Sequence, residues 1–114
     1  MTFKNEYSEE RRIQESNKIV TKYPTRIPII VEKSENCDLT DISKKKYLVP
    51  KELSLQQFMY IIRKRIRLDP SKALFVTINN SLSPASLTLG EIYNDKKDND
   101  GFLYITYTSE NTFG

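Results

Sequence analysis

The strongest structural signal in the chain is one amphipathic helix over residues 55–67. Ser54 and Gln57 form a capping box, in which each side chain accepts a hydrogen bond from the other residue's backbone N–H. Apolar residues then recur at i, i+3, i+4, i+7 and i+11 along one stripe, namely Leu55, Phe58, Met59, Ile62 and Ile66. A helix with one apolar stripe must lie on another layer of structure, so the remaining segments have to supply that layer.

Four segments have the composition of β-strands. Residues 26–32 and 46–50 are rich in β-branched and apolar side chains, and the polar stretch between them predicts a hairpin. Pro28 cannot donate a ladder hydrogen bond, so it belongs near the start of its strand. Residues 73–78 have the apolar composition of a buried strand, and residues 102–107 are apolar on both faces. The last of these is therefore expected in the centre of the sheet.

Two further helices are predicted outside the central one. Residues 9–22 are polar and compatible with a helical arm on the surface, which Pro24 ends. Thr88 and Glu91 make a second capping box, which opens a short helix through Tyr93. A hairpin, a long helix and a central final strand together predict an α+β fold, the ubiquitin-like β-grasp with an N-terminal helical addition.

The composition argues against an enzyme. The 114 residues include no histidine, which removes imidazole bases and most zinc sites, and one cysteine, which excludes an internal disulfide. A reducing compartment suits such a chain, and Cys37 is interpreted as a thiol without a catalytic role. Asp98 and Asp100 resemble part of a calcium loop, but Lys96 and Tyr107 stand at required ligand positions. No metal or other cofactor is expected, and no apolar run reaches the roughly 18 residues of a membrane span.

Charge is distributed unevenly along the chain. Residues 1–72 carry 16 Lys and Arg against 10 Asp and Glu, whereas residues 73–114 carry 2 against 5. The basic part would suit an acidic peptide, an anionic membrane surface or a nucleic acid, and the balance of charge does not choose among them.

The basic residues cluster at 44–46 and 63–67, and this cluster has three interpretations. It could bind nucleic acid, with Tyr47 and Tyr60 stacking on bases, or it could be an ordinary solvated face. The third interpretation, which we prefer, is a lysine-flanked edge strand at residues 46–50 that pairs with an extended acidic peptide.

Five segments spread over nearly the whole chain resemble the autophagy-related ubiquitin-like modifiers, the GABARAP family and its fungal and plant counterparts. They are Tyr23-Pro24-Thr25-Arg26-Ile27-Pro28, Lys44-Lys45-Lys46-Tyr47-Leu48-Val49-Pro50, Ile62-Arg63-Lys64-Arg65-Ile66, Asp100-Gly101-Phe102-Leu103-Tyr104 and Glu110-Asn111-Thr112-Phe113-Gly114. The resemblance implies a β-grasp with two N-terminal helices. It also implies three regions, namely a helical extension at 1–24, a ubiquitin-like core at 25–108 and a flexible conjugation tail at 109–114.

The resemblance implies two pockets for a receptor's short linear motif. The pocket for the aromatic residue of the motif corresponds to Glu15, Ile19, Pro28, Lys46, Leu48 and Phe102. The pocket for its aliphatic residue corresponds to Tyr47, Val49, Pro50, Leu53, Phe58, Ile61 and Arg65. Arg26 and Lys44 correspond to basic residues that meet acidic side chains flanking the motif.

The resemblance further implies a lipid-conjugated modifier of autophagy. Gly114 corresponds to the residue that is joined to phosphatidylethanolamine after ubiquitin-like activation. The implied partners are activating and conjugating enzymes, a processing and delipidating cysteine protease, and cargo receptors with aromatic-x-x-aliphatic motifs. The implied locations are the cytoplasm, the autophagosome membrane and the vacuole or lysosome. A non-conjugated adaptor that uses the same pockets is the competing interpretation, and a small nucleic-acid binder is the third.

Two positions depart from the family pattern. Ser8-Glu9 stands where relatives often have Pro-Phe before the second helix. Thr77 stands where relatives commonly carry a second Phe in the strand around Phe75. The short hydroxyl side chain of Thr77 reduces the apolar area of this strand face, which serves as an alternative docking face in relatives.

Overall fold

A four-stranded mixed sheet with the strand order β2-β1-β4-β3 forms the centre of the fold. The structure is a computed structural model and describes residues 2–35 and 37–109. Its strands are β1 (Arg26–Lys33), β2 (Lys46–Pro50), β3 (Phe75–Thr77) and β4 (Leu103–Thr108). Its helices are α1 (Phe3–Glu6), α2 (Glu9–Lys22), α3 (Leu55–Arg65) and α4 (Leu89–Lys96). The α+β class and the β-grasp order predicted from the sequence are confirmed.

The pairing of the strands follows the predicted scheme. β1 and β2 form an antiparallel hairpin in which Pro28 lies opposite Leu48, and β2 is an edge strand. β4 runs parallel to β1 in the centre, with Ile30 opposite Tyr104, and pairs antiparallel with β3 on its other side. Pairing between β1 and β4 begins only at Ile29, so the missing N–H of Pro28 costs the sheet no ladder bond.

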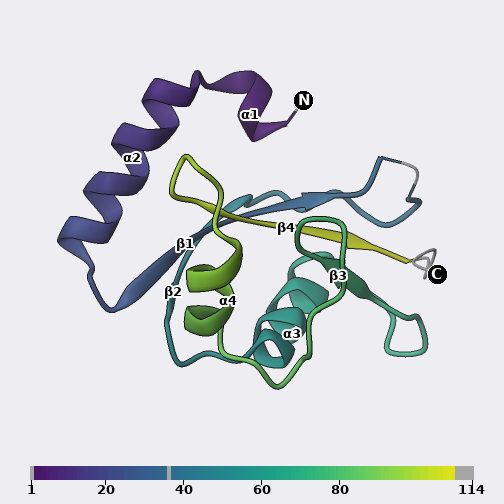
Figure 1. Cartoon of the computed structure of the whole chain (residues 1–114). Helices are drawn as coiled ribbons and strands as arrows, with labels where there is room; N and C mark the ends of the chain where they lie inside the picture. The colour runs from purple at the N-terminus through teal and green to yellow at the C-terminus, as the bar shows by residue number, and fades with distance from the viewer. Residues whose placement is uncertain (1, 36, 110–114) are drawn as a thin grey trace.

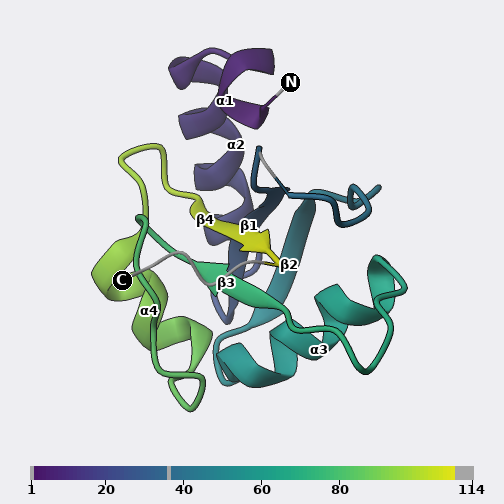
Figure 2. The same cartoon turned by 90° about the vertical axis from the view of Figure 1, so that its right-hand side faces the viewer.

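Helices cover both faces of the sheet. Figures 1 and 2 show α3 and α4 against one face and the N-terminal helices α1 and α2 on the other. The main core lies between the sheet and α3, where side chains such as Phe58, Ile62 and Tyr107 are fully buried. A smaller core of Phe3, Ile30 and Phe102 lies under α1 and α2.

The helix boundaries differ slightly from those predicted. Both bonds of the Ser54–Gln57 capping box are present, but α3 ends at Arg65 rather than residue 67. Arg67 adopts a left-handed φ of 53°, and the N–H of Leu68 donates to the carbonyl of Arg63, which closes the helix without a glycine. α4 continues past Tyr93 to Lys96, and the N-terminal segment holds two helices, as the family resemblance implied.

One close approach fastens α2 to the loop before β4. Gly101 has a φ of +91°, and a Cβ atom at this position would lie 2.3 Å from Ser16 Oγ on α2. The left-handed backbone and the lack of space both require glycine. This close contact places α2 directly over the start of β4.

None of the helices in the described part of the chain is long and apolar enough to cross a membrane.

Candidate peptide-docking site

The edge strand β2 offers two sets of backbone hydrogen-bonding groups. The N–H of Lys51 donates to the carbonyl of Thr25 and the N–H of Val31 to that of Lys45, at 3.1 and 2.8 Å. In an antiparallel ladder such bonded pairs alternate with non-bonded pairs. In the observed register Lys46 and Leu48 fall in the non-bonded pairs, so their N–H and C=O groups point to the outer edge. A guest strand would pair with these groups.

The residues predicted for the aromatic pocket come together on the face of the sheet under α2. Pro28 and Leu48 are direct cross-strand neighbours, and Glu15 of α2 forms an ion pair with Lys46. Ile19 of α2 packs against the small core that contains Phe102, and Phe102 is fully buried. Two residues from α2, three from β1 and β2, and Phe102 directly before β4 therefore lie on the same side of the sheet.

Phe3 belongs to this site, and sequence reasoning missed it. Its ring lies 5.2 Å from that of Phe102 in an edge-to-face arrangement, and Lys46 Nζ lies 5.8 Å from the Phe3 ring centroid. The backbone N–H of Phe3 donates to Glu32 Oε2 at 2.8 Å, which holds α1 against β1. The local signal that could have indicated this contact is the pair of aromatic residues Phe3 and Tyr7 in an otherwise polar N-terminal segment.

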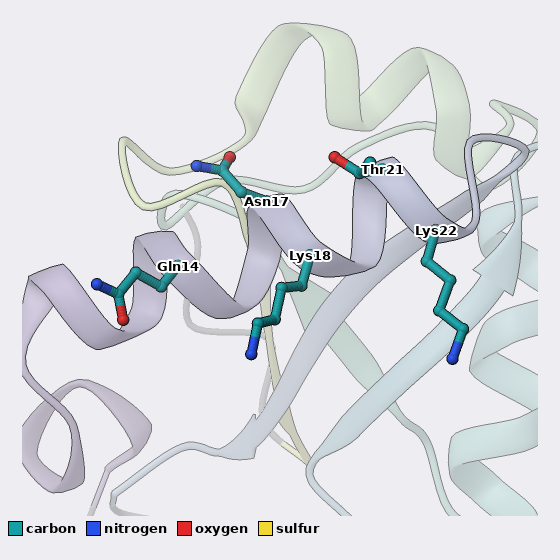
Figure 3. Close-up of a pocket in the computed structure, with 5 residues that line it drawn as sticks. All are labelled: Gln14, Asn17, Lys18, Thr21 and Lys22. Carbon is teal, nitrogen blue, oxygen red and sulfur yellow. The ribbon is translucent and has the colours of Figure 1, made fainter.

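Two surface pockets lie along α2. One of about 380 Å³ is lined by Tyr7, Arg11, Gln14, Glu15, Lys18 and Lys46, and thus includes two residues of the predicted aromatic pocket. A larger, open one of about 670 Å³ lies farther along the helix (Figure 3), where the side chains of Lys18 and Lys22 extend in the same direction. It contains none of the predicted site residues. The cations along α2 give the neighbourhood of the aromatic pocket a basic character.

The residues predicted for the aliphatic pocket lie on the opposite face of β2, toward α3. Tyr47 and Val49 are buried, and the Tyr47 ring meets that of Phe58 edge to face at 5.5 Å. Leu53 and Ile61 are partly buried against the same core, whereas Pro50 is exposed at the end of the strand. Apart from Pro50, which alternates onto the face of Lys46 and Leu48, the residues predicted for the two pockets therefore lie on opposite faces of β2.

Four cations lie close to the β2 edge. Arg65 Cζ and Lys44 Nζ lie 5.9 and 5.1 Å from the centroid of the Tyr47 ring. Arg26 Nη1 donates to the carbonyl of Leu48 at 3.3 Å, so it lies at the outward-facing backbone of β2. With Lys46, these side chains make the edge attractive to a peptide that carries acidic residues.

A buried ion pair, which no local sequence pattern predicts, holds α2 in position. Arg12 Nη1 donates to Asp100 Oδ2 at 2.6 Å, with side-chain exposures of 10% and 0%. The backbone N–H of Phe102 donates to Asp100 Oδ1, and the Tyr104 hydroxyl donates to Oδ2. Burial and this bond to Asp100 raise the pKa of Tyr104. Burial alone would lower the pKa of Arg12, but the interactions with Asp100 and Tyr104 together outweigh burial, so the pKa is raised.

The remaining predicted residue, Gly114, lies outside the described residues. The described chain ends at Ser109, whose hydroxyl donates to Asp38 Oδ1 at 3.2 Å.

Comparison with known proteins identifies relatives over nearly the whole chain. Residues 11–114 match the family model described as autophagy protein Atg8, ubiquitin like. Autophagy-related protein 8B of Oryza sativa subsp. indica is 53% identical over 113 residues, which cover 99% of this chain and 95% of the relative. Autophagy-related protein 8 of Saccharomyces cerevisiae strain YJM789 is 51% identical over 113 residues, with coverage of 99% and 97%.

Solved structures agree with this result. The crystal structure of Trypanosoma brucei ATG8 superposes with a TM-score of 0.91 at 39% identity, and covers 100% of this chain and 98% of that one. Plasmodium falciparum Atg8 in complex with a P. falciparum Atg3 peptide superposes with a TM-score of 0.89 at 34% identity, with coverage of 96% and 97%.

Proposed function

Because this chain belongs to the Atg8 family of ubiquitin-like autophagy proteins, we propose that it is a modifier that docks receptor peptides on β2 and is conjugated to phosphatidylethanolamine through Gly114. Partner enzymes would adenylate the carboxylate of Gly114 and carry it as cysteine thioesters. The lipid amine would then attack the thioester, so that an amide forms and the thiolate leaves. The protein would thus supply a carboxylate and a docking surface, and the enzymes would supply the catalysis.

The observation that carries the docking half of this proposal is the outward-facing backbone of Lys46 and Leu48 between two pockets. An extended peptide would add there as a fifth strand, with register set by backbone bonds and specificity by alternate side chains. Its aromatic residue would enter the pocket near Phe102, and its aliphatic residue would lie near Phe58. Acidic residues flanking the motif would meet Arg26 and Lys44.

The comparisons support the conjugation half of the proposal. The family match includes residue 114, and the solved P. falciparum relative is bound to a peptide of Atg3. We infer that a conjugating enzyme of the same kind, an activating enzyme and a processing and delipidating cysteine protease are partners of this chain. The conjugated protein would recruit cargo receptors to the autophagosome membrane and pass with it to the vacuole or lysosome, while the free form would be cytoplasmic.

Truncation of Leu48 tests the docking proposal. Leu48→Ala shortens a side chain predicted to line the aromatic pocket and keeps the backbone of residue 48. We expect affinity for a tryptophan-containing receptor peptide to fall about thirtyfold, or about 2 kcal/mol. The measurement is calorimetric titration of the peptide. Leu82→Ala is the matched control, because Leu82 is 49% exposed in the loop after β3 and lies outside the site. Unchanged affinity in a folded Leu48→Ala variant would contradict the pocket assignment.

The face of β3 gives a second prediction, in which a substitution strengthens peptide binding. Thr77 lies opposite Thr106, and Phe75 lies opposite Thr108, so threonines surround the one aromatic residue of β3. Thr77 is also only 6% exposed. We expect peptides that dock on this face in relatives to bind this protein weakly.

Replacement of Thr77 by Phe should restore such binding by about tenfold, because the ring adds apolar contact area. Fluorescence polarisation with a peptide that binds this face of a relative measures the gain. Thr77→Val is the control, since it removes the hydroxyl without adding a ring. Tight binding by the unmodified protein would show that the threonine does not weaken this face.

A further inference from the structure

The C-terminal end of β4 lies beside a pocket that the peptide-docking site does not use. The last residue pair between β4 and β3 joins Thr108 to Phe75 (Figure 2). The hydroxyl of Ser109, the next residue, donates to Asp38 Oδ1 at 3.2 Å and lies 3.7 Å from Cys37 Sγ. Asp38 also lines a pocket of about 320 Å³ between its own loop and the connection from α3 to β3. The last described residue of the chain therefore lies directly beside this pocket.

The hydrogen-bonding groups that remain available in this pocket are mainly donors. Of its two carboxylates, that of Asp38 accepts a bond from Ser109, and that of Asp69 accepts bonds from the N–H and the hydroxyl of Ser71 at 2.9 and 2.8 Å. Its two cations, Arg67 and Lys72, are exposed, and neither side chain forms an ion pair within the described residues. A further carboxylate would find two charged donors here.

The backbone holds both cations in place. Arg67 has a φ of 53°, a conformation that costs arginine more than it costs glycine or asparagine, and strained residues of this kind cluster at functional sites. The N–H of Lys72 donates to the carbonyl of Asp69 at 2.9 Å, and Arg63 Nη1 donates to the carbonyl of Lys72 at 3.0 Å. The two positive charges are therefore fixed at one side of the pocket before a ligand binds.

The tail of the chain has matching chemistry and sufficient length. In the proposed function Gly114 carries a free carboxylate, and the aromatic residue Phe113 precedes it. Continued three residues past its last pair, the antiparallel register of β3 and β4 would place residue 111 opposite Lys72. The three residues that remain span at most about 10 Å, which is the scale of a pocket of this volume.

We propose that residues 110–114 dock in this pocket of the same molecule, with the Gly114 carboxylate against Arg67 and Lys72 and the Phe113 ring against the partly buried Leu68. The docked tail withholds its carboxylate from the activating enzyme, so that only the undocked fraction reacts. Exposed ion pairs are weak, so docking slows conjugation and does not prevent it. This regulatory consequence rests on the proposed conjugation through Gly114, whereas docking itself requires no enzyme.

The order of the tail backbone in three proteins tests the docking. They are the full chain, the double variant Arg67→Asn/Lys72→Gln and the control Lys18→Gln/Lys22→Gln. Asparagine suits the left-handed backbone at residue 67, so the first variant removes two charges and keeps the end of α3. The control also removes two charges, but from the pocket along α2 (Figure 3). Nitrogen-15 relaxation gives the order parameters of residues 111–113.

We expect order parameters above about 0.6 in the full chain and in the control, and below about 0.6 in the Arg67→Asn/Lys72→Gln variant. Lower values in the full chain, or unchanged values in the Arg67→Asn/Lys72→Gln variant, would overturn the docking. An equal decrease in the control would show that the overall charge holds the tail, which also overturns the role of this pocket.

Thioester formation with the activating enzyme tests the regulatory consequence. The Arg67→Asn/Lys72→Gln variant should have a KM about threefold lower and an unchanged kcat, because the competent fraction of tails rises from about one third toward one. A structural defect alone would not lower KM. An unchanged KM despite a disordered tail would overturn the withholding of the carboxylate. If the full chain forms no thioester, the conjugation proposal fails, and the order parameters still decide whether the tail docks.

Discussion

Deletion of Gly114 is expected to abolish conjugation to phosphatidylethanolamine. A terminal glycine has no Cβ, so its carboxylate can enter a narrow enzyme cleft and be attacked without hindrance from a side chain. Loss of this residue leaves Phe113 as the terminal residue, with a benzyl side chain beside the reacting carbon. The measurement is the electrophoretic mobility shift of the lipidated protein in cells that contain the conjugation enzymes.

Two comparisons make this result specific. Gly114→Ala should reduce the lipidated fraction strongly without abolishing it, because a methyl group is the smallest obstruction. Both variants should bind receptor peptides with the affinity of the full chain, since Gly114 is not part of the docking site. Lipid attached to the C-terminus of the deletion variant would contradict the modifier proposal and favour a non-conjugated adaptor.

Neutralisation of Asp100 is expected to cost about 3–5 kcal/mol of unfolding free energy. Asp100→Asn keeps the shape of the side chain but leaves the guanidinium of Arg12 buried without its counter-charge. The variant should also weaken peptide binding, because Arg12 and Asp100 hold α2, which carries Glu15 and Ile19, against the start of β4. Urea unfolding followed by circular dichroism gives the change in stability.

The exposed pair between Lys4 and Asp98 provides the control for this prediction. Its N–O distance of 2.7 Å is nearly that of the Arg12–Asp100 pair, but the side chains are 48% and 29% exposed. Lys4→Met should therefore cost far less than Asp100→Asn, because water screens exposed pairs. Equal losses for the two variants would show that burial does not set the strength of the Arg12–Asp100 interaction.

The parts of the fold that depend on local signals could be predicted from the sequence. The capping box at Ser54 and the apolar stripe that follows it predict α3. The strand around Ile105 is apolar on both faces, which predicts its central position in the sheet. The end of α3 could not be predicted, because Arg67 adopts a left-handed conformation that glycine or asparagine usually adopts at the end of a helix. Contacts between distant segments, such as those of Phe3 with Phe102, leave no periodic signal in either segment.

The candidate site likewise combines features that the sequence predicts with features that it does not. The β-grasp order predicts that the lysine-flanked strand at residues 46–50 lies at the edge of the sheet, and the structure confirms this edge position. The Arg12–Asp100 pair and the buried hydroxyl of Tyr47, which has no hydrogen-bond partner among the described residues, depend on which groups meet in space, and composition and spacing do not determine this. The ion pair bears on the rigidity of the site, because it holds α2 against the start of β4.

Amide hydrogen exchange along β2 tests the central claim, the addition of a peptide strand at this edge, most directly. The N–H groups of Tyr47 and Val49 belong to pairs bonded to β1, whereas those of Lys46 and Leu48 point outward. A receptor peptide at saturation should slow exchange at Lys46 and Leu48 by more than tenfold and change exchange at Tyr47 and Val49 much less. Binding without added protection at Lys46 and Leu48 would contradict strand addition at the β2 edge.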